Sequence, residues 1–137
     1  MDHELIARAH RLLRDRYVPN RHAVAAAVRT HDGRMFTGLH LGATVARVSV
    51  CAEAVALGQA IMAEQAQLAA IAAVHHAGTP SAATTALVSP CGMCRDLLSD
   101  YAPTLQVILP GEQGEPASTT ISELLPRKFV RPSPESS

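Results

Sequence analysis

Hydrophobic residues near the start of the chain recur at the spacing of an amphipathic helix, with Asp2 in the position of an N-cap. Pro19 and Asn20 end this predicted helix. Two apolar segments follow, and the pair Asp32-Gly33 between them predicts a tight hairpin turn. The helical pattern is carried by Leu5, Ile6, Ala9, Leu12 and Leu13, and the two predicted strands span 22–30 and 35–41.

The rest of the chain continues to alternate between predicted helices and strands. The segment 68–76 is ambiguous, but its Ile and Val residues and its position favour a strand. The Val-rich end of the loop before Cys51 could also form a short strand. The remaining predictions are a long Ala-rich helix over 51–67, a loop over 78–85, a strand over 86–89, a helix over 91–101, a strand over 105–109, a short helix over 121–125 and a disordered polar tail over 131–137.

This order of elements predicts an α/β fold in which helices pack on a mixed, mostly buried sheet of five strands. The chain has 137 residues, and the sequence shows no internal repeat and no domain boundary, so we expect a single domain over 1–130. Apolar residues make up 47% of the sequence, many of them Ala and Val, and there is no Trp. Such small side chains suit helices that pack closely on a sheet.

Charge and cysteine content narrow the range of functions. The formal net charge is zero, so no basic field points to nucleic acid as a partner. No run of 18 or more apolar residues indicates a membrane span, and the charged N-terminal segment does not have the pattern of a signal peptide. The three cysteines cannot all pair within the chain. This favours a cytoplasmic metal or redox role over a disulfide framework.

The candidate chemistry lies in two short motifs, each at the predicted start of a helix: Cys51-Ala52-Glu53 and Pro-Cys91-Gly-Met-Cys94. Cys91 and Cys94 stand three apart and share one helix face, and helix N-termini favour thiolates. With Cys51 they supply three ligands, the pattern of a catalytic zinc site whose fourth position holds water. Zinc lowers the pKa of such a water to about 7, and Glu53 is near enough to take its proton without binding the metal.

Each part of this pattern also has a simpler explanation. Cys-Gly-Met-Cys after a strand is equally typical of a thiol–disulfide redox motif. Cys51 alone would be a buried small residue, and Glu53 alone would complement the helix dipole. The combination accounts for every cysteine and favours a metal site. Two hypotheses of other classes remain: a redox protein that uses Cys91 and Cys94 without metal, and a zinc-stabilised binding module without catalysis.

These motifs lead to a family. Over nearly its whole length the chain resembles the small homotetrameric cytidine deaminases, including the related blasticidin S deaminases. Segments 57–58 and 114–116 look slightly closer to the blasticidin branch, whereas 40–51 has the length usual for cytidine deaminases. The matching pieces are 24–27, 32–34, 36–38, Cys51-Ala52-Glu53, 89–95 and 123–126 before Phe129.

The resemblance implies a three-layer α-β-α fold, a zinc ion as cofactor, and a hydrolytic deaminase of pyrimidine salvage. Such an enzyme converts a cytosine nucleoside to the uracil nucleoside and ammonia. Glu53 would deliver a proton to N3 of the ring and then to the departing amine, and backbone groups of Ala52 and Ser89 would hold the edge of the base. A homotetramer is also implied, in which Phe129 either closes a neighbouring pocket or packs in the core of its own subunit.

The departures from the family pattern concern the substrate. An Asn-x-Glu pair usually binds the ribose, and its positions hold His40 and Gly42. Gly42 has no side-chain acceptor, so a ribose hydroxyl would lose a partner worth about 1–3 kcal/mol, and we expect poorer use of plain cytidine. His22 stands where an aromatic residue usually packs on the base; for His40, an ordinary strand residue with satisfied nitrogens is an equal alternative. Ala54 replaces an Arg that offsets thiolate charge, which leaves that role to Arg95 or to the helix N-termini.

Overall fold

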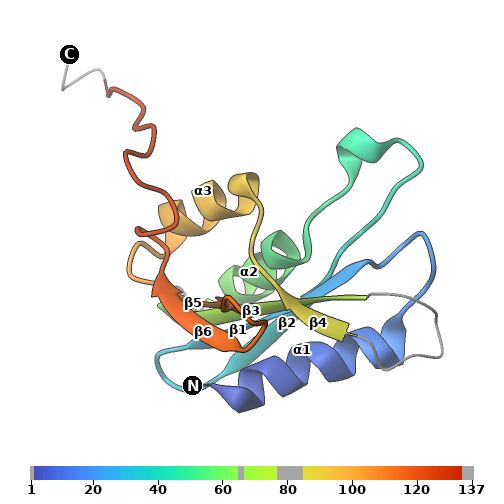
Figure 1. The fold of residues 1–137 in the computed structure, drawn as a ribbon. Coiled ribbons are helices and arrows are strands. Elements are labelled where there is room, and N and C mark those ends of the chain that lie inside the picture. Colours follow the sequence, from blue (N-terminus) through green and yellow to red (C-terminus); the bar gives the residue numbers. More distant parts are fainter. Residues whose placement is uncertain (1, 65–66, 77–84, 134–137) are drawn as a thin grey trace.

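The computed structural model describes residues 2–64, 67–76 and 85–133. Within these ranges the chain forms three α-helices, one short 3-10 helix and six strands (Figure 1). In chain order they are α1 (His3–Arg16), β1 (Val24–Thr30), β2 (Met35–Leu39), η1 (Ala46–Val48), α2 (Ala52–Met62), β3 (Leu68–His76), β4 (Thr85–Val88), α3 (Gly92–Tyr101), β5 (Gln106–Pro110) and β6 (Pro116–Thr120).

The six strands form one mixed sheet in the order β2-β1-β3-β5-β6, with β4 paired to β3 beside this path. Strands β3 and β5 are parallel, and the other pairs are antiparallel. One edge of β3 pairs with β5 through residues 70–72 and with β4 through residues 73–76. The chain leaves β4 and enters α3 directly, which carries Cys91 over the sheet. The predicted mixed α/β fold is confirmed.

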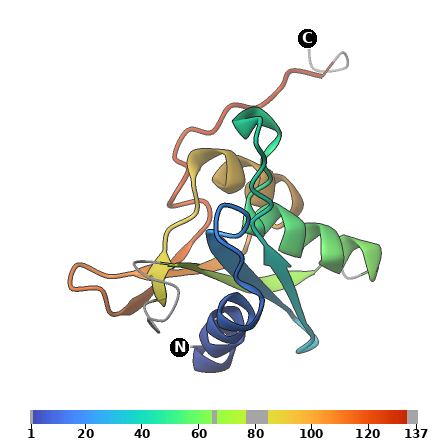
Figure 2. The same ribbon diagram turned by 90° about the vertical axis from the view of Figure 1, so that its right-hand side faces the viewer.

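The molecule has three layers, with α1 on one face of the sheet and α2 and α3 on the other (Figures 1 and 2). The alternation of side chains along β1 shows why small residues suit this arrangement. Ala25 and Ala27 face α1, whereas Ala26 and Val28 face α2 and α3, and all four are fully buried. Their short side chains let both helical layers approach the central strand. None of the helices in the described ranges is long and apolar enough to span a membrane.

Helix α1 begins as the sequence predicts, with Asp2 as its N-cap. The Asp2 carboxylate accepts a hydrogen bond from the backbone N–H of Leu5 at 3.1 Å. The same carboxylate accepts a second bond from Arg29 Nε on β1 at 2.6 Å. The cap therefore also ties the start of α1 to the central strand, while Leu5, Ile6, Ala9 and Leu13 bury the apolar face of the helix.

Gly38 on β2 allows α2 to lie unusually close to the sheet. A Cβ atom at this position would lie 2.4 Å from the backbone nitrogen of Ala56 and 2.6 Å from the carbonyl oxygen of Ala52. Both are backbone atoms that cannot rotate away, so only glycine permits this contact. The approach fixes the first turns of α2, which carry the Cys51-Ala52-Glu53 motif.

Several sequence predictions need correction. The sheet has six strands instead of five, because Pro116–Thr120 adds an edge strand, β6, built from small residues without the alternation that reveals a strand. The predicted helix over 121–125 is wrong: the segment forms hydrogen-bonded turns, such as Leu124 N–H to Ile121 C=O. Helix α2 ends at Met62, short of residue 67. Before Cys51, Val50 makes only an isolated bridge with Leu41.

Two further predictions fall mostly outside the described residues. The expected loop over 78–85 lies there apart from Thr85, which begins β4. Of the expected tail, residues 131–133 are described and have no regular secondary structure, whereas 134–137 lie outside.

Candidate zinc centre and adjoining cavities

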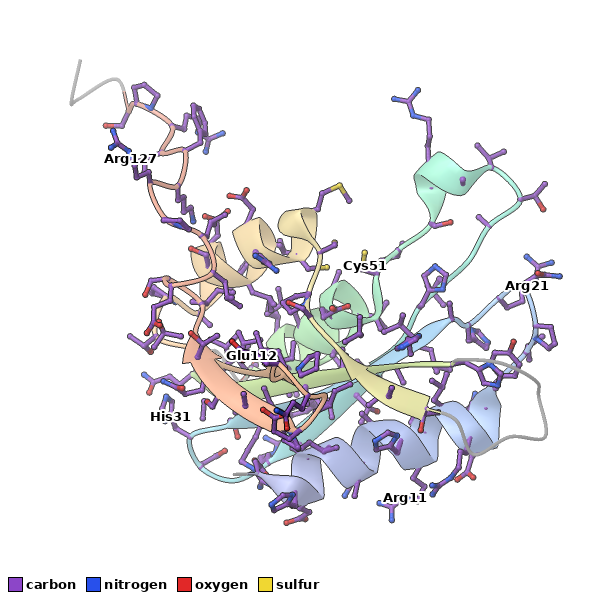
Figure 3. All side chains as sticks on the ribbon, in the orientation of Figure 1. Arg11, Arg21, His31, Cys51, Glu112 and Arg127 are labelled. Carbon is purple, nitrogen blue, oxygen red and sulfur yellow. The ribbon has the colours of Figure 1, made fainter. Side chains whose placement is uncertain are left out.

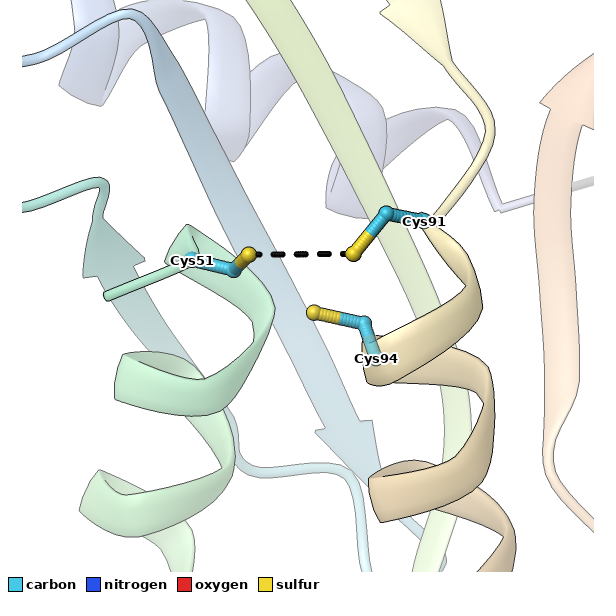
Figure 4. A group of neighbouring side chains, drawn as sticks. All are labelled: Cys51, Cys91 and Cys94. Carbon is cyan, nitrogen blue, oxygen red and sulfur yellow. Dashed lines mark hydrogen bonds between the residues drawn. The ribbon is translucent and has the colours of Figure 1, made fainter. Parts of the chain in front are cut away.

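The two cysteine motifs meet at the facing starts of α2 and α3. Cys51 immediately precedes α2, Cys91 immediately precedes α3, and Cys94 lies in the first turn of α3 (Figure 4). The three Sγ atoms lie within 4.8 Å of one another, and those of Cys51 and Cys91 are 3.8 Å apart. Sequence positions 40 residues apart thus converge on one point, as the motif analysis predicted.

The thiols are held in different electrostatic surroundings. Burial raises the pKa of Cys51, and burial together with the nearby Glu53 carboxylate raises the pKa of Cys94. Burial also opposes ionisation of Cys91, but hydrogen bonds from the backbone N–H of Cys94, the thiols of Cys94 and Cys51 and the backbone N–H of Met93 together outweigh it and lower the pKa of Cys91. The start of α3 therefore stabilises a thiolate at Cys91, and a cation among the three sulfurs would do so for the other two.

This donor set fits zinc. Three thiolates form a soft ligand set, and zinc prefers cysteine sulfur in four-coordinate sites. Three protein ligands leave the fourth position open, which distinguishes a catalytic zinc site from a closed structural one. The burial of the three cysteines also fits a site with an open position: Cys94 is buried, Cys51 is half-buried and Cys91 is exposed. The centre is therefore anchored in the core and reachable from solvent.

Glu53 lies beside this centre in the first turn of α2 and is 6% exposed. Burial raises the pKa of its carboxyl group. Glu53 lines a cavity of about 280 Å³ together with Cys51, Cys91, Ala52 and Ser89. The cavity thus brings together a buried carboxyl group, two of the three thiols and the backbone of the two motifs. Ala23, Val24, His40 and Val88 complete its lining.

His22, His40 and Gly42 lie around a second cavity of about 370 Å³ that shares His40 and Ala23 with the first. The backbone N–H of Ala23 donates to His40 Nδ1 at 3.0 Å, and His22 Nδ1 bonds the carbonyl oxygen of His40 at 2.9 Å. Gly42 lines this cavity, and the position of its missing side chain lies close to the preceding loop. A Cβ atom there would lie 3.0 Å from the carbonyl oxygens of both Asn20 and Arg21.

Phe129 lies outside both cavities, in the extended arm that follows β6 (Figure 1). Its side chain is 77% exposed, so it is not a core residue of its own chain. Lys128 beside it holds the arm to α3 through Ser99 at 2.9 Å and through an ion pair with Asp100. Phe129 is thus presented to the surroundings of the molecule.

Two contacts at the site go beyond what the sequence analysis predicted. Arg95 or the helix N-termini were expected to offset thiolate charge, and the Arg95 guanidinium donates to the Pro90 carbonyl oxygen at 2.9 Å, the Leu124 carbonyl oxygen at 3.1 Å and Ser89 Oγ at 3.0 Å. It clamps the passage from β4 into α3. At the second cavity, the ring of His76 stacks on Tyr17 with centroids 3.8 Å apart. No sequence motif marks Tyr17 or His76.

Fold and site together define a class: a three-layer α/β protein with a three-cysteine zinc centre at two helix starts. Comparison with known proteins agrees. The family model described as "Cytidine and deoxycytidylate deaminase zinc-binding region" matches residues 1–109. A blasticidin-S deaminase of Bacillus cereus is 41% identical over 131 residues, which cover 95% of this chain and 93% of the relative. The chain therefore belongs to the cytidine deaminase family.

Other relatives are cytidine deaminases. One from Sporosarcina psychrophila is 31% identical over 93% of this chain and 90% of its own. Among solved structures, cytidine deaminase from Burkholderia pseudomallei superposes with a TM-score of 0.76 at 33% identity, covering 94% of this chain and 99% of the other. The resemblance read from the motifs is thus confirmed, and both branches of the family remain represented among the relatives.

Proposed function

We propose that this chain is a zinc-dependent hydrolase that removes the exocyclic amino group from the cytosine ring of a nucleoside. The observation that carries the proposal is the cavity in which the three-cysteine centre and the buried Glu53 lie together. Cys51, Cys91 and Cys94 are the proposed metal ligands and Glu53 the proposed proton carrier. Water and a cytosine nucleoside give the uracil nucleoside and ammonia.

Different residues of the chain bind the substrate and transfer protons in this reaction. Backbone groups of Ala52 and Ser89, which line the cavity, hold the edge of the base. A zinc ion with an open coordination position supplies activated water at neutral pH. Glu53 would accept one proton of that water and pass it to N3 of the ring. It would then carry the second proton, from the hydroxyl group added to the ring, to the departing amino group, which leaves as ammonia. Because Glu53 is buried, bulk water does not compete for the proton during transfer.

A second substrate candidate is blasticidin S. The observation in its favour is the 41% identity to the blasticidin-S deaminase of Bacillus cereus, with nearly complete coverage of both chains. The chemistry at the cytosine ring would be the same, and only the fit of the remaining part of the substrate would differ. Direct comparison of cytidine, deoxycytidine and blasticidin S as substrates distinguishes the two branches.

We further propose a homo-oligomer, in the form of a tetramer, with Phe129 reaching a neighbouring subunit. Exposed apolar residues support it, because Val45 and Val48 around η1 and Phe129 and Val130 on the C-terminal arm are largely exposed to solvent. Both segments project on the side of the sheet that carries α2 and α3 (Figures 1 and 2). Residues 1–130 are proposed as one domain with 131–137 as its tail. We also propose a role in pyrimidine salvage in the cytoplasm. The three free thiols support this compartment, because the cytoplasm is reducing.

The test is the substitution Glu53→Gln, which keeps the size of the side chain and removes the proton carrier. Zinc content should stay at about one ion per chain, because Glu53 is not a proposed ligand. Ammonia release from the best cytosine nucleoside should fall by at least about 10²–10⁴-fold. Glu112→Gln, at an exposed position of the β5–β6 hairpin, is the matched control and should change neither quantity.

Three outcomes would count against the proposal. Full activity without bound metal would exclude a zinc hydrolase. A reversible disulfide without bound zinc would instead indicate the thiol redox protein. Bound zinc without ammonia release from any cytosine nucleoside would indicate a zinc-stabilised binding module.

A further inference from the structure

A third cavity, of about 220 Å³, lies between α1 and the edge strand β2. It shares no described lining residue with the two cavities near the cysteines. Figure 3 shows Arg11, one of its lining residues, on α1 and on the other side of the sheet from Cys51. Its lining from α1 has the three- and four-residue spacing of a single helix face and consists of Arg8, Arg11, Leu12, Asp15 and Arg16.

Thr37 completes the described lining from β2. Side chains alternate along a strand, and Met35 and Leu39, two positions to either side, both pack in the core beneath α1. The Thr37 side chain therefore lies on the α1 face of the sheet, half-buried, and within the described ranges its hydroxyl group has no hydrogen-bond partner. The cavity thus contains a free hydroxyl donor opposite the basic face of the helix.

Arg8 carries a buried donor that the described part of the chain does not satisfy. Its Nε atom is shielded from solvent and has no hydrogen-bond partner there. Buried polar groups in folded proteins are nearly always paired, so an unpaired guanidinium nitrogen indicates a missing acceptor. Glu4, one helical turn before Arg8, does not supply that acceptor, because its carboxylate pairs with Arg29 on β1 at 3.5 Å.

The charge of the cavity is also left uncompensated. Three guanidinium groups against the one carboxylate of Asp15 give its lining a formal net charge of +2. In the described ranges, neither Arg11 nor Arg16 forms an ion pair or a side-chain hydrogen bond, and Asp15 pairs with none of the three arginines. Several unpaired cationic donors beside a hydroxyl group are what a multivalent oxyanion requires.

We propose that this third cavity binds a phosphate group, either inorganic or carried by a nucleotide. Arg8, Arg11 and Arg16 would donate from their planar guanidinium groups, which match phosphate oxygens in pairs, and Thr37 would donate from its hydroxyl group. The bound phosphate would satisfy the buried Nε atom and compensate the positive charge together. It would also join α1 to β2 at the residue before Gly38, whose opposite side contacts the start of α2.

The test is isothermal titration calorimetry of the zinc-loaded protein with inorganic phosphate, pyrophosphate, adenosine diphosphate and adenosine. Phosphate and pyrophosphate should each saturate at about one site per chain, pyrophosphate more tightly because of its larger charge. Their affinities should fall as KCl is raised, because exposed charges are screened. Comparing adenosine diphosphate with pyrophosphate, and with adenosine alone, shows whether a nucleotide or an inorganic phosphate is preferred. Zinc content before and after each titration verifies that no probe removes the metal.

Variants connect the binding to the proposed donors. Arg8→Ala should weaken pyrophosphate binding by roughly tenfold to a hundredfold, as expected for a hydrogen bond to a charged group, and Thr37→Val by roughly threefold to tenfold. Arg8→Lys keeps the charge without the planar fork, so it should recover only part of the affinity. Arg14→Ala is the matched control, because it removes the same charge from the same helix at a position that does not line the cavity.

Melting curves without phosphate show which variants are folded, and Thr37→Val or Arg8→Lys can replace an Arg8→Ala protein that does not fold. In the unchanged protein, saturating pyrophosphate should raise the melting temperature, because it binds the folded state. Absence of saturable binding of both phosphate and pyrophosphate would overturn the proposed site. An equal loss of affinity in Arg14→Ala and in the cavity variants would indicate general attraction to a basic helix and would overturn it as well.

Discussion

Replacing Gly38 with alanine should weaken the zinc centre although Gly38 touches none of its sulfurs. The added methyl group would lie 2.4 Å from Ala56 N, 2.6 Å from Ala52 O and 2.9 Å from Val55 C, all backbone atoms of α2. Ordinary contacts of a Cβ atom begin near 3.4 Å, so the first turns of α2 must move by about 1 Å. Such overpacking costs about 1–3 kcal/mol of unfolding free energy.

The same displacement carries Cys51 and Glu53 with it. A misplacement of about 1 Å can reduce turnover by about 10²-fold, so kcat per bound zinc should fall by a comparable factor. Unfolding in urea, followed by circular dichroism with and without zinc, measures the stability. Release of zinc to a colorimetric chelator measures the affinity, which should also fall.

Gly58→Ala is the matched control because Gly58 lies in the interior of the same helix. Nothing lies within 4 Å of its added Cβ atom, so this change should stabilise the helix by about 0.5–1 kcal/mol and spare the zinc. If Gly38→Ala unfolded at the same urea concentration as the unchanged protein and held zinc as tightly, the close approach of β2 and α2 would not position the centre. Equal loss of stability and of zinc affinity in both variants would indicate a general effect of replacing glycine with alanine.

Three further predictions follow from individual contacts. Cys91→Ala should release zinc, measured by elemental analysis, and lower the melting temperature, because metal binding is coupled to folding. Arg29 holds the pKa of Asp2 below its ordinary value. The ionised Asp2 carboxylate therefore stabilises the folded protein at a pH above the pKa of Asp2 in the unfolded chain, and this stabilisation is lost as the pH falls below about 4. In urea titrations, Asp2→Ala should therefore lower the free energy of unfolding by about 1 kcal/mol at pH 7 and by little at low pH. Asp15→Ala is the control and should not show this difference between the two pH values. Phe129→Ala should shift the oligomer toward smaller species in analytical ultracentrifugation, whereas an unchanged mass would refute a subunit contact.

The sequence predicts best what short-range patterns control. The apolar spacing of α1 and the N-cap at Asp2 depend on residues a few positions apart, and the structure has both. The two cysteine motifs predict the zinc centre for the same reason, since each opens a helix by its own local signals. Their convergence was predictable because three ligands of one metal must meet, whatever the path of the chain between them.

Long-range features escaped prediction for physical reasons. Strand β6 consists of small residues and is defined by its hydrogen bonds to β5, which no local sequence pattern predicts. The turns after it replace a predicted helix, because five residues form little more than one helical turn, which is too short to be stable as a helix. His76 was read only as the end of a strand, yet its stack on Tyr17 joins segments about sixty positions apart.

The two ends of the proposed substrate site are formed by different structural elements. This explains how the reaction chemistry and the substrate specificity can vary separately. The reacting end stands on two helix starts, and one of them is locked against the sheet at Gly38, so changes there disturb zinc and turnover together. The far end is formed by loops and strand ends around His40, whose ring is held by a backbone amide rather than by the core. Substitutions in that region can change which nucleosides bind while the cysteines and Glu53 stay in place. Restoring the family's ribose pair by His40→Asn with Gly42→Glu requires the loop to shift slightly, because a Cβ atom at position 42 would lie 3.0 Å from the carbonyl oxygens of Asn20 and Arg21.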